Sequence, residues 1–381
     1  MATTRTTEKS PSSSRKTGAT THQLPGQVVL VMQGGGALGA FQAGVYQALH
    51  EAGIEPDWVV GTSIGAINAA LIAGNKPADR LDRLRKFWDL MASDCATCEQ
   101  WDIFGMGRAA HNLTTVTKGI PGFFTPNPRA WFGNHTPLGV SDAAYYSTTP
   151  LRQTLADLVD FQLVSQGKTR LTLGAVNVGS GQMRYFDSRQ EAVALEHVMA
   201  SGALPPAFPA VIIDGEPYWD GGIYSNTPIE VVMDDNPRRD SLIFSAQLWQ
   251  QEGEAPQSID AVISRQKDIQ FGSRAESHTT RQQQIHHLRH IVRELGALLP
   301  EGLRHTPQTK ELLAWGCSTV MHIVPLSAPR LDDEDETKDI DFTPIGIRAR
   351  WEAGYQQASQ QIAAAPWKQP IDPVAGIVVH R

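Results

Sequence analysis

The sequence predicts an α/β protein built on a mostly parallel central sheet. Residues 27–32 form a short, β-branched apolar run, which is typical of a strand buried on both faces of a parallel sheet. A stretch with apolar residues at helical spacing follows at 40–49, and a second strand-like run follows at 57–60. This order predicts a β-α-β unit, in which each strand leads into a glycine-rich turn at the same edge of the sheet.

Periodicity and turn signals predict the remaining elements. We expect further helices at 66–73, 78–92, 149–158, 192–200, after 226–228, at 259–299 and at 344–363. We expect further strands at 171–177, 182–186, 210–213, 241–249 and 319–324, the first two of them joined as a hairpin. The acidic run 332–336 is interpreted as a solvated loop.

Charge and cysteine content narrow the class of protein. The 381 residues carry a net charge of −7; residues 1–26, an expected disordered tail, carry four basic residues against Glu8, or +3, which leaves −10 for the remainder. This balance argues against nucleic acid as the main partner. Three cysteines are too few for a disulfide framework, which predicts a reducing compartment. Lacking a secretory signal and a membrane-spanning run, the chain is expected to be cytoplasmic and at most peripheral to a membrane.

A lone C-x-x-C at Cys95 and Cys98 is the only metal-like motif. A structural zinc site needs four ligands, and Cys317 and His111 would have to join without any spacing signal. We therefore expect neither a metal nor a cofactor.

The strongest chemical signal is the G-x-S-x-G turn with Ser63 at its centre, between the second strand and a helix. This layout is that of a nucleophile elbow, in which a serine is raised on a strained turn. Gly61 and Gly65 remove the side chains that would collide across so sharp a bend. The turn also places Ser63 at a helix N-terminus, which favours developing negative charge.

The first strand ends in a glycine loop formed by Gly34, Gly35, Gly36, Ala37 and Gly39. Its spelling also matches G-x-G-x-x-G, so a nucleotide-binding protein that uses this loop as a phosphate cradle is the alternative interpretation. A dinucleotide site would want an acid at the end of the second strand, where the Ser63 turn stands instead. Consecutive glycines can present several N–H groups to an anion, which favours an oxyanion hole.

A serine nucleophile needs a base, and the turn Asp220-Gly221-Gly222 presents a carboxylate with little steric cover. Asp220 could contact Ser63 directly, or it could be the acid of a triad with a later histidine. The candidates for that histidine are His278, His286, His287, His290, His305 and His322, and none has a flanking glycine or turn signature.

In this order, the three motifs resemble the patatin-like phospholipase (lipid acyl hydrolase) family, and most of all its bacterial members with an extra C-terminal region. The resemblance implies a three-layer α/β/α fold, with a catalytic domain at 27–235 and a mainly helical C-terminal extension, 236–381, packed on it. It further implies Ser63 as nucleophile, Asp220 as its base, an oxyanion hole of N–H groups in the glycine loop, and supporting turns at Gly61, Gly65, Gly221 and Gly222.

Two positions depart from the family pattern. Leu38 stands where members often have a basic residue, and Gln33 stands where they have an acid. The groups that act on the ester there belong to the backbone, so these departures bear on the recognition of a phosphate head group and not on the chemistry.

Two long segments allow alternative interpretations. Residues 94–148 lack periodicity but are rich in aromatics, which predicts either a lid or wall of an acyl-binding pocket or an Ω-like insertion packed on itself. The helical stretch 259–299 carries four arginines and four histidines on its polar face. It is either a surface for anionic lipid head groups or a solvated helix face.

The expected function is a serine acyl-ester hydrolase, of phospholipase A or lysophospholipase type, acting on a lipid or other hydrophobic ester. A catalytically silent scaffold that binds lipid surfaces through 259–299 is a third hypothesis.

Overall fold

The computed structural model describes residues 24–92, 107–331, 334–372 and 374–381. Its main sheet has the order β11-β10-β9-β1-β2-β5-β8-β7, with β6 paired to β5. The strands of its parallel part are β1 (Gln27–Met32), β2 (Trp58–Thr62), β5 (Arg170–Asn177), β9 (Ser241–Gln247), β10 (Met321–Ser327) and β11 (Ile377–Val379). The predicted mostly parallel sheet is confirmed.

The strand β1 lies at the centre of the sheet and packs on both faces. Val28, Leu30 and Met32 point into the larger core, which they share with the helices on one face. Val29 and Val31 point to the opposite side, into a smaller core that includes part of the short helix α9 (Glu230–Met233). Because side chains alternate along a strand, an unbroken apolar run predicts this two-sided burial.

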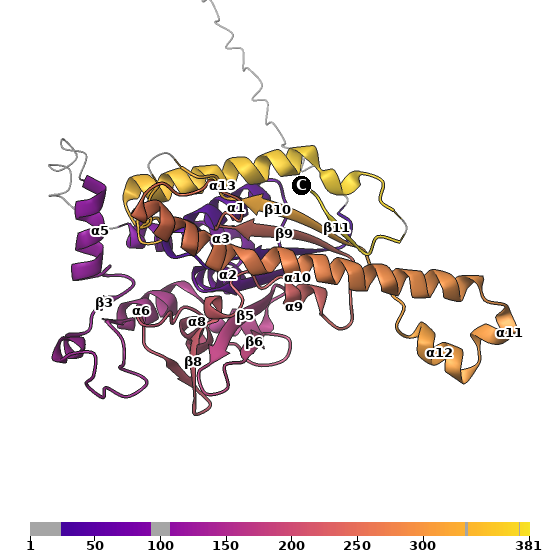
Figure 1. The fold of residues 1–381 in the computed structure, drawn as a ribbon, viewed down its shortest axis with the longest axis horizontal. Helices are drawn as coiled ribbons and strands as arrows, with labels where there is room; N and C mark the ends of the chain where they lie inside the picture. Colours follow the sequence, from indigo (N-terminus) through magenta and orange to yellow (C-terminus); the bar gives the residue numbers. More distant parts are fainter. Residues whose placement is uncertain (1–23, 93–106, 332–333, 373) are drawn as a thin grey trace, which may run out of the picture.

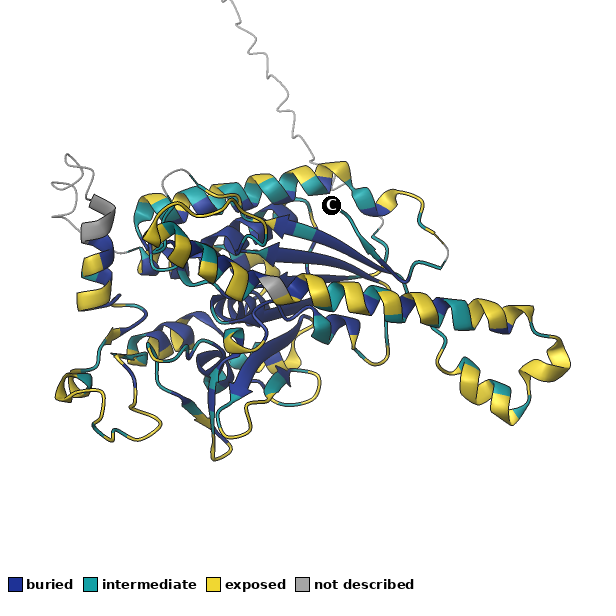
Figure 2. Ribbon diagram, in the orientation of Figure 1, coloured by how far each residue is buried: buried dark blue, intermediate teal, exposed yellow. Residues whose placement is uncertain are grey.

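Helices cover both faces, which completes the predicted three-layer α/β/α arrangement (Figure 1). One face carries α1 (Ala40–Glu51), α2 (Ile64–Ala73), α3 (Pro77–Met91), α6 (Thr149–Leu158), α7 (Phe161–Gln166), α8 (Leu195–Ser201) and α13 (Pro344–Ala364). On the other face, α9 packs against the 40-residue helix α10 (Ile259–Leu298). Figure 2 shows the central strands of the sheet buried, whereas the far end of α10 is exposed.

One end of the sheet is antiparallel. β6 (Met183–Asp187) returns beside β5 as the predicted hairpin, and β8 (Glu216–Asp220) pairs with β5 and with β7 (Val211–Ile213). The sequence analysis did not identify β8 as a strand of its own, because it is short and contains Pro217.

The residues after 235 contribute to the same sheet. β9 pairs with β1 along its whole length, and β10 and β11 extend the sheet outward from β9. The helix α13 lies along α1, where Gly44 and Gly354 allow the two backbones to approach closely. The boundary suggested at residue 235 therefore runs between strands that pair with each other.

Several expectations differ from the structure. The supposedly aperiodic stretch 94–148 contains the helix α5 (Gly107–Lys118), the short strands β3 (Thr125–Pro126) and β4 (Tyr146–Ser147), and the 3-10 helix η2 (Pro128–Phe132). The sequence analysis also missed α11 (Glu301–Arg304) and α12 (Pro307–Leu313), which with the end of α10 form a projecting arm (Figure 1). Within the described part of the acidic run, Glu334 is not solvated but lies beside buried Arg350.

Some predictions concern residues that the structure does not describe. These residues are the expected tail, apart from residues 24–26, and the two cysteines Cys95 and Cys98. Among the described residues, every helix is too short or too polar to cross a bilayer.

Candidate active site

Ser63 occupies a strained turn between β2 and α2. Its φ of 56° and ψ of −127° lie where residues with a Cβ atom rarely occur. A Cβ added to Gly61 would lie 2.3 Å from the Gly65 carbonyl oxygen, and one added to Gly65 would lie 2.2 Å from that of Met32. The two glycines thus permit the turn, as the G-x-S-x-G spacing predicts.

A second serine, which the sequence analysis missed, fixes this turn from outside. The N–H of Ser63 donates to the carbonyl oxygen of Ser201 at 3.1 Å and to its hydroxyl at 3.2 Å. The Ser201 hydroxyl in turn donates to the Gly174 carbonyl at 2.6 Å. Ser201 is the last residue of α8, so only the tertiary fold brings it to Ser63.

The register of the sheet brings Asp220 to the same place. Thr62 of β2 pairs with Gly174 of β5, and the next residue of β5, Ala175, pairs with Asp220 at the end of β8. The residue before Ser63 and Asp220 itself are therefore almost in register across the three adjacent strands β2, β5 and β8. Gly174, the partner of Thr62 on β5, has no side chain to stand between them. Ser63 and Asp220 both line one cavity.

Asp220 is a buried carboxylate with an altered acidity. It is only 1% exposed, and this burial raises its pKa to about 7. The Ser63 side chain and the Gly222 N–H favour the charged form and so oppose part of this rise. Its Oδ1 accepts a 2.7 Å hydrogen bond from the Gly222 N–H. Its Oδ2 is buried and makes no direct hydrogen bond to a described residue.

Only part of the glycine loop can serve as an oxyanion hole. Gly35 and Gly36 line the cavity, and within the described chain their N–H groups donate to no other group. The N–H of Gly34 donates to the Asn226 carbonyl at 3.1 Å, and that of Ala37 donates to the Asp339 carbonyl at 2.8 Å.

The prediction that Gly34 and Ala37 also offer free donors is therefore wrong. Gly39 does not line the cavity; a Cβ added there would lie 2.5 Å from Ile64, so its role is close packing against α2. The 3-10 helix η1 (Gly36–Gly39), in which Gly36 has a φ of 56°, turns the later N–H groups away.

The amide of Gln33 anchors the start of this loop. It donates to the Thr227 hydroxyl at 2.6 Å and accepts from the N–H groups of Leu248 and Trp249. Because an amide both donates and accepts, it satisfies groups that a carboxylate could not all serve. The departure from the family at Gln33 is thus a structural anchor, 1% exposed.

The departure at Leu38 is also explained by packing, since Leu38 is buried in the larger core. Two further anchors were missed by the sequence analysis. Asn226 Nδ2 and Trp249 Nε1 both donate to the Gly34 carbonyl, at 3.0 and 2.7 Å. Neither belongs to a recognisable motif, so no signal in the sequence identifies them.

The cavity that joins these residues has a volume of about 180 Å³ and a mainly apolar wall. Five aromatic rings of this wall contact one another: Phe123, Phe124, Tyr146, Phe208 and Phe342. Three of them come from the segment 94–148, for which a pocket wall was one of two interpretations. The described part of that segment does form a wall.

The C-terminal region supplies another part of the wall. Asp339, Ile340 and Phe342 line the cavity, in a segment that the sequence analysis left without a role. Lys338 holds this segment to α10 through a 2.7 Å bond to Asp268, and Lys267 reaches the Asp339 carboxylate at 2.7 Å. Residues of the predicted extension are thus built into the cavity.

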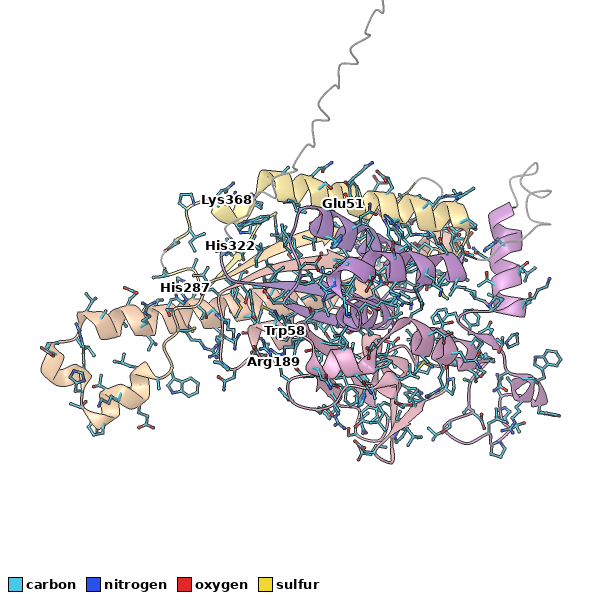
Figure 3. All side chains as sticks on the ribbon, turned by 180° about the vertical axis from the view of Figure 1, so that it is seen from behind. Glu51, Trp58, Arg189, His287, His322 and Lys368 are labelled. Carbon is cyan, nitrogen blue, oxygen red and sulfur yellow. The ribbon has the colours of Figure 1, made fainter. Side chains whose placement is uncertain are left out.

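No described histidine lines the cavity, so the structure does not support the triad. His278 faces Glu230, and His286 is buried near the Met233 carbonyl. Figure 3 labels two others, His287 on α10 and His322 on β10, and His322 contacts His380. The described residues also contain no group of three or more His, Cys, Asp or Glu side chains arranged to hold a metal ion.

Comparison with known sequences identifies the family. The sequence model of the patatin-like phospholipase family matches residues 30–233, more than half of the 381 residues. The chain belongs to the patatin-like phospholipase family. A second family model, described as patatin phospholipase, matches residues 269–374, which includes α13 and most of α10.

Curated relatives match over short stretches. Human patatin-like phospholipase domain-containing protein 6 is 44% identical over 61 residues, which is 16% of this chain and 4% of that protein. Lysophospholipase nte1 of Aspergillus terreus is 51% identical over 69 residues, 17% of this chain and 4% of that protein. An uncharacterised NTE family protein of Mycobacterium tuberculosis is 43% identical over 79 residues, 20% of this chain and 14% of that protein. The chain thus spans a small fraction of the length of these relatives.

Solved structures are similar over most of this chain but only distantly. VipD from Legionella pneumophila has 16% identity and a TM-score of 0.38, covering 90% of this chain and 67% of that one. The type III effector protein ExoU has 14% identity and a TM-score of 0.35, covering 90% and 53%. Scores this low do not support a closer comparison.

Proposed function

We propose that this protein is a serine hydrolase of lipid acyl esters, with Ser63 as the nucleophile and Asp220 as its base. The observation that carries the proposal is the meeting, in one apolar cavity, of a strained serine and a buried carboxylate whose pKa is raised to about 7. An ordinary aspartate is too weak a base for a hydroxyl, whereas a pKa near the working pH suits a general base.

The reaction proceeds through an acyl-enzyme. Ser63 Oγ attacks the ester carbonyl carbon while its proton passes to Asp220, and the carbonyl oxygen becomes an oxyanion that the Gly35 and Gly36 N–H groups bind. The carbon–oxygen bond to the alcohol then breaks, and Asp220 returns the proton to the leaving alcohol. Water then attacks the acyl carbon while Asp220 takes its proton; the bond to Ser63 Oγ breaks, Asp220 returns the proton to that oxygen, and the free acid leaves.

The wall of the cavity favours a hydrophobic acyl chain as substrate. Aromatic and aliphatic side chains form most of it, and the few polar groups gather at Ser63 and the glycine loop. An apolar pocket with a few convergent polar groups is typical of a small-molecule site.

The same features argue against the nucleotide-binding alternative. Asp220 lies in the cavity beside the glycine loop, where its carboxylate would repel a phosphate. A half-buried serine on a strained turn is also not needed to hold a nucleotide.

Labelling with a fluorophosphonate probe tests the proposal. We expect stoichiometric labelling of Ser63, together with release of fatty acid from a panel of phospholipids, lysophospholipids and glycerides. Ser63→Ala should take up no label. An unreactive Ser63 in folded wild-type protein would refute the proposal and favour a silent scaffold.

A further inference from the structure

An exposed aromatic pair stands out on the surface. Trp131 is 84% exposed and Phe132 is 78% exposed, both on the 3-10 helix η2. They belong to the segment between β3 and β4, which lies with α5 at the opposite end of the molecule from the α10 arm (Figure 1). Two adjacent aromatic side chains without any cover are an unusual use of surface for a folded protein.

The segment 127–145 between β3 and β4, here called the tip, has a defined structure that hydrogen bonds maintain. β3 and β4 pair as a short antiparallel ribbon at its base. Asn127 Nδ2 donates to the carbonyls of Asp142 and Ala144 at 3.0 and 2.9 Å, and Arg129 pairs with the Asp142 carboxylate at 2.8 Å. The aromatic pair is therefore displayed by a defined turn.

The tip continues directly from the wall of the active-site cavity. Phe124 lines the cavity immediately before β3, and Tyr146 lines it from β4. Trp131 lies seven positions after Phe124, so the tip lies within about 25 Å of the cavity. One exposed apolar residue also lines the cavity itself: Val116, which is 45% exposed.

The charge of this region fits an anionic surface. Residues 111–149 contain Lys118 and Arg129 against Asp142 alone, or +1, whereas the whole chain carries −7. Basic residues near a membrane surface are attracted to anionic lipids, and Trp and Phe partition into the interfacial layer. The net positive charge and the exposed aromatic pair therefore favour a lipid surface over a protein partner.

We infer that Trp131 and Phe132 insert into a lipid bilayer and hold the cavity mouth against its surface. The inference rests on the proposed function, since it assigns the lipid surface from which that site takes its substrate. Insertion of the tip would bring the mouth to the depth at which the ester bonds of membrane lipids lie.

Vesicle binding tests the inference without hydrolysis. In a Ser63→Ala background, we compare Trp131→Ala/Phe132→Ala with its parent by sedimentation with vesicles of phosphatidylcholine and phosphatidylglycerol. Losing the burial of two aromatic side chains should lower the partition coefficient at least about tenfold. The matched control is Leu312→Ala/Trp315→Ala on the arm, where the side chains are 67% and 69% exposed; it should bind as the parent does.

Activity assays complete the test. With Ser63 intact, the tip variant should hydrolyse a soluble short-chain ester at the wild-type rate but vesicle lipid more slowly, and its thermal unfolding should be unchanged. Equal vesicle binding by tip variant and parent would overturn the inference, as would loss of binding in the arm variant alone. Vesicle binding that depends on the tip, in a protein that cleaves no ester, would support the inference while refuting the proposed function.

Discussion

The two turns that carry Ser63 and Asp220 are unusual in different ways: one in its backbone, the other in its burial. The Ser63 turn is strained in its backbone, with a φ of 56°, and its side chain is half-buried. The Asp220 turn has an ordinary φ of −51° but a side chain that is 1% exposed. The proposed nucleophile therefore depends on backbone geometry, whereas the proposed base depends on the exclusion of water.

This difference shows where each turn is vulnerable. Added atoms near Gly61 or Gly65 would disturb the serine, because the backbone is already in close contact there. The carboxylate would instead be disturbed by anything that admits water or supplies a hydrogen-bond donor to Oδ2.

The largest expected effect is on catalysis. Asp220→Asn removes the base while keeping the shape of the side chain, and we expect kcat for a soluble ester to fall by about 10⁴-fold. No single His→Ala change should come near this loss, because no described histidine lines the cavity. A histidine variant that is folded but as inactive as Asp220→Asn would restore the triad.

The next effect concerns stability. Since burial raises the pKa of Asp220 from 3.8 to about 7, the folded state holds this proton more tightly than the unfolded state does. The contribution of the group to stability is thus greatest below about pH 4, and it is lost as the pH rises from there through about 7. At pH 8, Asp220→Asn should raise the free energy of unfolding by up to about 4 kcal/mol.

Denaturant unfolding at pH 4 and pH 8 measures this change. The stabilisation should be largest at pH 8 and small at pH 4. If Asp220→Asn were less stable than wild type at pH 8, the contacts of the carboxylate would outweigh the cost of removing it from water, contrary to this prediction.

A smaller effect tests the crowding around the serine. Gly65→Ala would place a methyl group 2.2 Å from the Met32 carbonyl oxygen, so we expect a loss on the order of 3 kcal/mol in the free energy of unfolding. Gly302→Ala is the control, because a Cβ there meets nothing within 4 Å. Similar stability of the two variants would mean that the elbow can relax.

The smallest effect reports the strain itself. Ser63→Gly should be more stable than Ser63→Ala by about 1 kcal/mol, because glycine adopts positive φ without a Cβ clash. Both variants lack the hydroxyl, so the comparison isolates the backbone. Equal unfolding midpoints would contradict a strained turn.

The features that could be predicted from the sequence are local ones. The β-α-β unit, the Ser63 turn and the Asp220 turn each follow from a few adjacent residues whose chemistry permits little else. The closing helix α13 also follows from its own periodicity. For these elements the sequence alone was sufficient.

The features that were missed depend on contacts between distant residues. Ser201, Asn226 and Asp339 hold Ser63 or the glycine loop through one or two hydrogen bonds each, which leave no pattern in the sequence. The claims on Gly34 and Ala37 were wrong for the same reason, since only the fold decides which N–H groups already have an acceptor. Glu334 was judged solvated because its partner, Arg350, is sixteen positions away.

The pairing of β1 with both β2 and β9 has a consequence for synthesis of the protein. Chains leave the ribosome N-terminus first. The strand that leads into the glycine loop has no second neighbour until residues 241–247 emerge, and the carbonyl of Asp339 that fixes the loop appears later still. We therefore expect the glycine loop of a nascent chain to lack its final support until the segment around Asp339 has been synthesised.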